Sequence, residues 1–113
     1  MKNPLIINNL NKNSYLPVWS AMQRHTQSRK PGATDQLWLV EHPPVFTQGK
    51  AGKPEHLLQQ SAIPLVQSDR GGQITYHGPG QIMAYTLFDL NRLQLNTRDF
   101  VCKLEKTVID CLA

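Results

Sequence analysis

Residues 70 to 81, R-G-G-Q-I-T-Y-H-G-P-G-Q, hold the densest set of groups that could do chemistry. Their four glycines let a ligand approach backbone N–H groups closely, and polar side chains surround them. Arg70 and His77 add positive charge or hydrogen-bond donors. Such a loop suits a carbonyl, carboxylate or phosphate group. A hairpin with a bulge and a polar loop is the structural alternative, and composition alone favours neither.

The spacing of these glycines excludes two familiar phosphate sites. It follows G-G-x5-G-x-G, whereas dinucleotide sites use G-x-G-x-x-G and the P-loop ends in Gly-Lys-Ser/Thr. One Arg-Gly-Gly is also too little for an RNA-binding tract. No nucleophile stands beside His77, so we interpret this residue as a hydrogen-bond donor or a structural clamp rather than a general base.

A second candidate stretch is E-H-P-P-V-F-T-Q-G at residues 41–49, where polar residues flank an extended apolar segment. It could form one wall of a pocket for an apolar chain, although a β-strand with a proline bulge is the simpler interpretation. The four histidines are widely separated, and neither C-x-x-C nor H-E-x-x-H occurs. We therefore expect no metal and no cofactor.

The two cysteines, Cys102 and Cys111, stand nine positions apart in one predicted helix. They point to opposite faces with roughly 13 Å of axial rise between them. A disulfide needs a much shorter separation, so we expect free thiols and a reducing compartment. Packing or surface roles are favoured over catalysis, with Cys111 on the core-facing side beside Leu104 and Val108.

The chain has 113 residues with 12 Lys or Arg, 8 Asp or Glu and a formal net charge of +4, which fits one small domain or less. Its apolar fraction of 40% argues against disorder. The positive charges occur singly except for Arg29 and Lys30, which is typical of an ordinary surface; an acidic protein or nucleic acid is the alternative partner. No apolar run could serve as a secretion signal or a membrane span, so we expect a soluble, cytoplasmic protein.

The elements that must position these residues alternate between helix and strand. Apolar residues at helical spacing predict a helix over Tyr15–Ser28, with Ser14 as its N-cap and Pro17 in its first turn. Short apolar runs predict strands at Leu5–Asn8, Gln36–Glu41, Val45–Thr47, Ile63–Gln67, Gln73–Tyr76 and Gln81–Phe88. Residues 50–62 are predicted to form a loop with one helical turn at 55–58.

A final helix begins at Asn96 or Thr97, and its predicted core face comprises Val101, Leu104, Val108 and Leu112. No glycine or basic last turn ends this helix. We therefore expect the sequence to be part of a larger domain.

Arg70 to Gln81, followed by Tyr85, resemble the signature of the lipoyl(octanoyl) transferases. These enzymes move an octanoyl group from acyl carrier protein to a lysine of lipoate-dependent proteins. Residues 37–49 and 63–70 resemble the same family in order and spacing, so the similarity extends from about Leu16 to Leu112. It implies an α/β fold, a mixed sheet with flanking helices, shared with the catalytic domains of lipoate- and biotin-protein ligases.

The resemblance implies that one run of residues lines the pocket for the acyl chain and its thioester end: Arg70, Gly71, Gly72, Gln73, Ile74, Thr75, Tyr76 and His77. It implies octanoyl-acyl carrier protein as the donor and lipoyl domains as acceptors, with no nucleic acid and no membrane. Acyl carrier proteins are strongly acidic, which would give the basic surface a use.

In this family a cysteine accepts the octanoyl group as a thioester, and a lysine lowers the pKa of that cysteine. Both lie in the second half of the family's domain, and neither Cys102 nor Cys111 matches the nucleophile. We therefore assign no catalytic residue and expect residues 1–113 to be the N-terminal half of one octanoyltransferase-like catalytic domain, inactive alone. The alternatives are an ATP-dependent lipoate- or biotin-protein ligase and a non-catalytic truncated product that at most binds an acyl chain or carrier protein.

Overall fold

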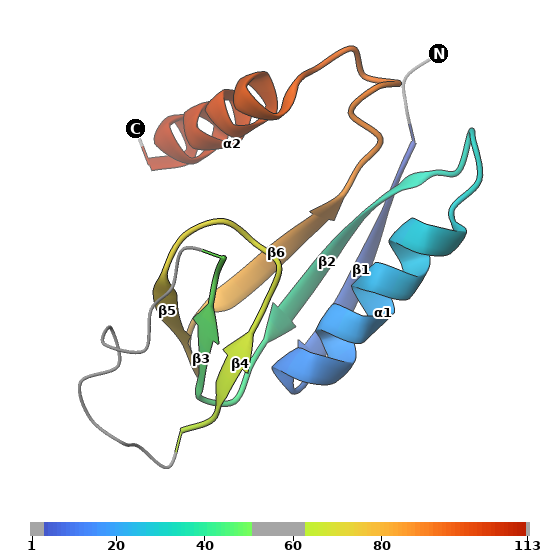
Figure 1. Ribbon diagram of the computed structural model, residues 1–113. Coiled ribbons are helices and arrows are strands. Elements are labelled where there is room, and N and C mark those ends of the chain that lie inside the picture. Colours follow the sequence, from blue (N-terminus) through green and yellow to red (C-terminus); the bar gives the residue numbers. More distant parts are fainter. Residues whose placement is uncertain (1–3, 51–62, 113) are drawn as a thin grey trace.

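The computed structural model describes residues 4–50 and 63–112, which form two three-stranded sheets and two helices (Figure 1). The elements in chain order are β1 (Leu5–Lys12), α1 (Tyr15–Ser28), β2 (Asp35–Glu41), β3 (Val45–Gln48), β4 (Leu65–Gln67), β5 (Ile74–His77), β6 (Ile82–Leu87) and α2 (Thr97–Leu112). One sheet has the order β1-β2-β6 and the other β4-β3-β5. Each contains one parallel and one antiparallel pair, which confirms the predicted α/β class with mixed strands.

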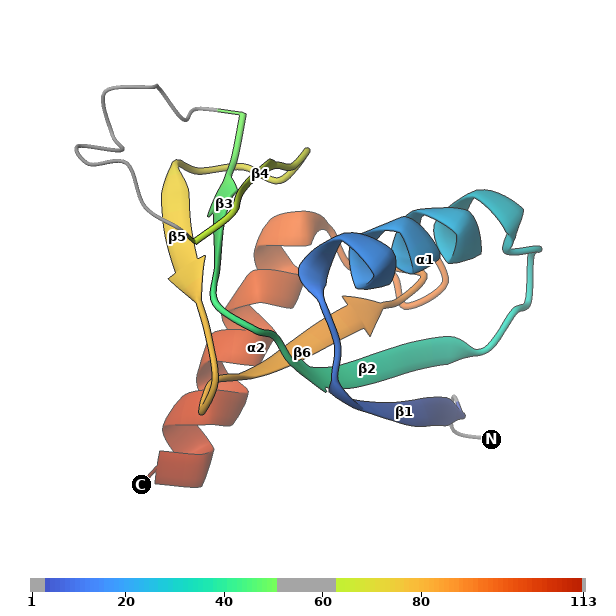
Figure 2. The same ribbon diagram turned by 90° about the horizontal axis from the view of Figure 1, so that it is seen from below.

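Helix α1 covers one face of the β1-β2-β6 sheet (Figure 2). Its buried Val18 packs against Trp38 and Val40 of β2 and Leu87 of β6. Trp38 and Val40 stand two positions apart on a strand and therefore face the same side of the sheet. The predicted bounds of this helix are confirmed, and Ser14 is its N-cap residue, although its side chain makes no capping hydrogen bond.

Pro43 and Pro44 separate β2 from β3 and carry the chain from one sheet into the other (Figure 1). Proline has no backbone N–H to donate, so the hydrogen-bond ladder of β2 cannot continue through them. For residues 41–49 the predicted extended conformation at both ends is confirmed, but a proline bulge within one strand is wrong, because the prolines separate two strands that belong to different sheets.

The chain turns between β5 and β6, where Gln81 N donates to Gly78 O at 3.1 Å and Gly80 has a φ of +88°. The hairpin alternative is nevertheless wrong, because β5 pairs with β3 and β6 pairs with β2. Val45 lies opposite His77, and Glu41 lies opposite Ile82. The pairs β2–β6 and β3–β5 are thus two parts of one longer antiparallel ladder. The prolines interrupt this ladder between β2 and β3, and the turn interrupts it between β5 and β6.

Helix α2 does not bury the face that its sequence pattern predicts. Asn96 Oδ1 accepts a hydrogen bond from Asp99 N at 2.8 Å, which confirms the predicted cap. The four residues of the expected core face are each at least 40% exposed, and both cysteines are free and exposed, including Cys111, which was predicted to face the core. The ring of Phe100, 5.4 Å from that of Phe88, is the aromatic contact at its start. Periodicity shows that this helix has an apolar face, but the described residues place no core against it.

Smaller differences concern the strand ends and the predicted loop. Strand β1 runs to Lys12 rather than Asn8, with an irregularity between Asn9 and Asn11 in its pairing with β2. The helical turn predicted at 55–58 lies outside the described residues. No helix in the described ranges is long and apolar enough to cross a membrane.

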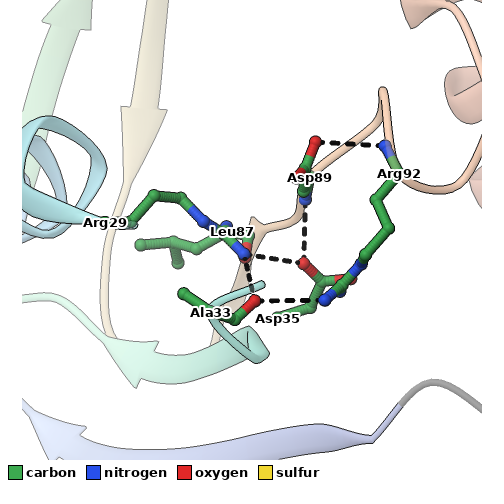
Figure 3. A network of polar contacts seen from close by, with 6 residues as sticks. All are labelled: Arg29, Ala33, Asp35, Leu87, Asp89 and Arg92. Carbon is green, nitrogen blue, oxygen red and sulfur yellow. Dashed lines mark hydrogen bonds and ion pairs between the residues drawn. The ribbon is translucent and has the colours of Figure 1, made fainter. Parts of the chain in front are cut away.

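A buried carboxylate, that of Asp35, joins the segments that meet at one end of the β1-β2-β6 sheet (Figure 3). Its Oδ1 accepts hydrogen bonds from Asp89 N at 2.8 Å and Arg29 Nη2 at 3.1 Å, and its Oδ2 lies 2.7 Å from Arg92 Nη2. Burial acts to raise the pKa of Asp35, but these partners outweigh it and the pKa lies below its ordinary value. The arginines also donate to backbone carbonyls, Arg29 to Ala33 and Leu87, and Arg92 to Ala33.

Replacing Asp35 with Asn should cost about 3 kcal/mol of unfolding free energy, because two largely buried guanidinium groups lose their counter-charge. Urea denaturation would measure the loss. Asp110→Asn is the matched control: its carboxylate pairs with Lys106 on the exposed surface of α2, so the change should stay within about 0.5 kcal/mol. Equal effects of the two substitutions would contradict the role given to Asp35.

Candidate functional site

A cavity of about 440 Å³ lies between α1 and the segment that follows β4. This volume is within the usual range for small-molecule sites. The described residues that line it come from α1, from the segment after β4 and from β6: Tyr15, Trp19, Met22, Gln23, Thr26, Gln27, Ser68, Asp69, Arg70 and Tyr85. Those of α1 recur at helical spacing and therefore form one stripe along the helix.

The inner part of this cavity is aromatic and its rim is polar. Tyr15 and Ser68 are buried, whereas Thr26, Gln27 and Asp69 are exposed. The rings of Tyr15 and Trp19 stack with their centroids 6.4 Å apart. Such an arrangement can enclose an apolar chain and leave a polar head group at the rim.

Arg70 lies at the edge of the cavity, but its guanidinium binds the protein itself. Its Nε and Nη2 donate to Thr47 Oγ1, and Nη2 also reaches Thr47 O at 2.8 Å and Gln73 O at 2.7 Å. Its Nη1 donates to Gly71 O at 2.7 Å. Arg70 therefore clamps the glycine loop, residues 70–73, to strand β3.

The glycine loop also needs a close backbone approach at Gly49. A Cβ on Gly49 would collide with the carbonyl oxygens of Gly72 and Gly71, and Gly49 N donates to Gln73 O at 3.1 Å. Gly72 has a φ of +92°, a conformation that favours glycine. Among the described residues the N–H groups of Gly71 and Gly72 donate to no partner, so two backbone donors remain free on the exposed loop.

The other predicted site residues, Ile74 to His77, form β5. Tyr76 is exposed and its ring packs 5.5 Å from that of Phe46. His77 is buried, with Nδ1 2.7 Å from Gln81 Oε1 and Nε2 3.4 Å from Thr47 Oγ1. These contacts match the clamp interpretation of His77. Among the described residues that line the cavity, Arg70 is the only one of the eight that the resemblance assigned.

Residues 14–113 match the lipoyl protein ligase A/B catalytic domain. The chain belongs to this family. It is 56% identical over 110 residues to the octanoyltransferase of Chromobacterium violaceum and 58% identical over 109 residues to that of Saccharophagus degradans. The alignments cover 97% and 96% of this chain but 53% and 50% of those proteins, so the chain spans about half the length of the curated relatives it matches.

Membership of the lipoyl protein ligase A/B family confirms the resemblance drawn from residues 70–81. Sequence reasoning nevertheless missed the contribution of α1, whose residues form most of the described cavity lining. The signal was present, since aromatic residues and then polar residues recur at helical spacing along the α1 stripe, but an ordinary amphipathic helix has the same pattern. The described part of this family member holds no group of three His, Cys, Asp or Glu side chains arranged for a metal ion.

The contacts of His42 were likewise not predicted from the sequence. It is 1% exposed, with Nδ1 2.6 Å from Asn13 O and Nε2 2.8 Å from the Tyr85 hydroxyl oxygen. Burial lowers the pKa of His42, while the bond to Asn13 acts in the other direction. Burial also raises the pKa values of Tyr15 and Tyr85, so both hydroxyls keep their protons at neutral pH.

Replacing Gly49 with Ala should destabilise the chain by about 1–3 kcal/mol, because the new methyl group meets backbone oxygens that cannot move without displacing the glycine loop. Denaturation in urea would measure this change. Gly71→Ala adds the same methyl group where no atom lies within 4 Å, so its stability should stay within about 0.5 kcal/mol of the unaltered chain. A Gly49→Ala chain as stable as Gly71→Ala would contradict the close approach.

Proposed function

We propose that this chain supplies the acyl-binding part of an octanoyltransferase of lipoate synthesis. The enzyme takes octanoyl from octanoyl-acyl carrier protein and transfers it to a lysine of lipoyl domains. The observation that carries the proposal is the aromatic cavity under α1, edged by the glycine loop, in a chain whose relatives are octanoyltransferases.

The cavity supports an octanoyl group as its occupant. The rings of Tyr15 and Trp19 and the side chain of Met22 provide apolar contact for an alkyl chain. The N–H groups of Gly71 and Gly72, which donate to no described residue, suit the carbonyl oxygen of a thioester, which accepts hydrogen bonds. Alkyl chain and carbonyl would thus meet different surfaces of one site.

We assign substrate binding to Arg70 through His77, with a different part for each segment. Arg70 fixes the loop at the cavity edge, Gly71 and Gly72 offer N–H groups, and Gln73 accepts hydrogen bonds from the clamp through its carbonyl. Ile74 to His77, as β5, anchor the loop to β3. Residues 1–113 would then be the N-terminal half of one catalytic domain.

The nucleophile would come from outside this chain. Cys102 and Cys111 are exposed on α2, and neither belongs to the described lining of the cavity. The net charge of +4 supports an acidic carrier protein as donor, and salt should weaken its association.

Octanoyl-pantetheine, the thioester end of the donor, should bind this chain and shift the indole N–H signal of Trp19 in an NMR titration, because Trp19 lines the cavity. Met22→Ala should weaken binding about tenfold by removing apolar contact. Met83→Ala is the matched control: both methionines pack against the core, but Met83 does not line the cavity. Equal losses from both substitutions, or binding of ATP in place of the thioester, would contradict the proposal.

The 113-residue chain should transfer no octanoyl from carrier protein to a lipoyl domain, because no thiol lines its described cavity. Intact mass spectrometry of the lipoyl domain after mixing would detect any transfer. Transfer that Cys102→Ser abolishes, while Cys111→Ser leaves it intact, would show that this chain holds its own nucleophile.

A further inference from the structure

A chain of hydrogen bonds lies behind the wall of the cavity. It runs from the Tyr85 hydroxyl through the His42 imidazole to the backbone carbonyl of Asn13, with distances of 2.8 and 2.6 Å. Tyr85 lines the cavity, whereas His42 is 1% exposed and does not line it. The Tyr15 ring, which also lines the cavity, packs edge-on against His42 with ring centroids 5.4 Å apart.

The chemistry of the three partners determines where the protons lie. A carbonyl oxygen cannot donate, so the short distance between Asn13 O and His42 Nδ1 requires a proton on Nδ1. A neutral imidazole carries one N–H, which leaves Nε2 as an acceptor. The Tyr85 hydroxyl must therefore donate its proton to Nε2 and cannot donate it into the cavity.

This direction matters for a cavity that holds an apolar chain. A phenol proton without a partner would bind water, and an alkyl chain that displaced the water would leave the hydroxyl unsatisfied, at about 1–3 kcal/mol. A hydroxyl that already donates to a buried acceptor avoids most of that loss. Tyr85 can then present its ring and oxygen to an alkyl chain.

We propose that His42 is a positioning residue for the acyl site: it accepts the Tyr85 hydroxyl proton and thereby makes this wall of the cavity able to hold an apolar chain. The proposal rests on the proposed function, because the acyl chain is the occupant considered. His42 acts through Tyr85 and touches no substrate.

The tautomer of His42 tests the first step without any variant of the pair. In the unaltered chain with ¹⁵N-labelled histidine, NMR at neutral pH should show His42 protonated at Nδ1 and unprotonated at Nε2. His25→Gln, His56→Gln and His77→Gln chains would assign the other histidine signals. A proton on Nε2 of His42, in either the other neutral tautomer or the imidazolium, would overturn the proposal.

A double-variant cycle tests the second step, with octanoyl-pantetheine as the probe and the Trp19 signal as the readout. His42→Leu should weaken binding about tenfold, because it leaves the Tyr85 hydroxyl at the cavity wall without its acceptor. Tyr85→Phe removes that hydroxyl and should bind within about threefold of the unaltered chain, because His42 does not line the described cavity. The double variant should bind within about threefold of the unaltered chain, since both polar groups are gone. A purely structural role would make the double variant bind at least as weakly as the weaker single variant, and that result would overturn the proposal.

The controls separate this inference from the proposed function. His25→Leu makes the same chemical change at a histidine outside the described cavity lining and should leave affinity unchanged. If the unaltered chain binds no octanoyl-pantetheine, the proposed function fails and this inference fails with it. If the unaltered chain binds and the His42→Leu chain binds equally well, only the inference fails. Thermal melts would verify folding, and if a single variant does not fold, the tautomer in the unaltered chain decides.

Discussion

The break at Pro43 and Pro44 is the constraint on which the rest of the structure depends. Two successive residues without an N–H end the ladder between β2 and β6, and the chain then enters a second sheet. The first sheet carries α1, and the second carries the glycine loop at the end of β3. The cavity lies between these two parts, so it exists because one long antiparallel ladder is divided at this point.

Buried and half-buried polar side chains hold this divided ladder together, and backbone carbonyls are prominent among their partners. Arg70 donates to three carbonyls around β3 and the glycine loop, and His42 bonds that of Asn13. Arg29 reaches two more beside Asp35. An arginine or histidine side chain that is hydrogen-bonded to these carbonyls stabilises the backbone of several segments, but it has fewer hydrogen-bond donors left for a ligand. Within the described part of the chain, the surface left for binding is therefore aromatic rings and the N–H groups of Gly71 and Gly72, which donate to no described partner.

Sequence patterns predicted the helices and strands whose bounds depend on interactions between residues close together in the chain. The bounds of α1 follow from helical periodicity and from Pro17 in its first turn, and the short strands follow from their apolar runs. The division into two sheets could not be predicted, because a Gly-Pro-Gly turn is compatible with a hairpin and with strands that pair elsewhere. The exposure of α2 had no sequence signal either: an amphipathic pattern shows that a face is apolar, not what covers it.

The residues of the site likewise divide into those that local sequence could predict and those that depend on contacts between distant residues. Arg70 was predicted because glycines and charge stand close together in sequence, whereas His42 bonds partners 29 and 43 positions away, a relation that no spacing rule contains. Arg70 lines the cavity and also fixes the glycine loop, whereas His42 acts on the cavity through Tyr85. Both cysteines stand on α2, outside the described lining. Under the proposed function, acyl binding and acyl transfer would therefore be separate properties, since the groups that would enclose the acyl chain line the described cavity and neither thiol does.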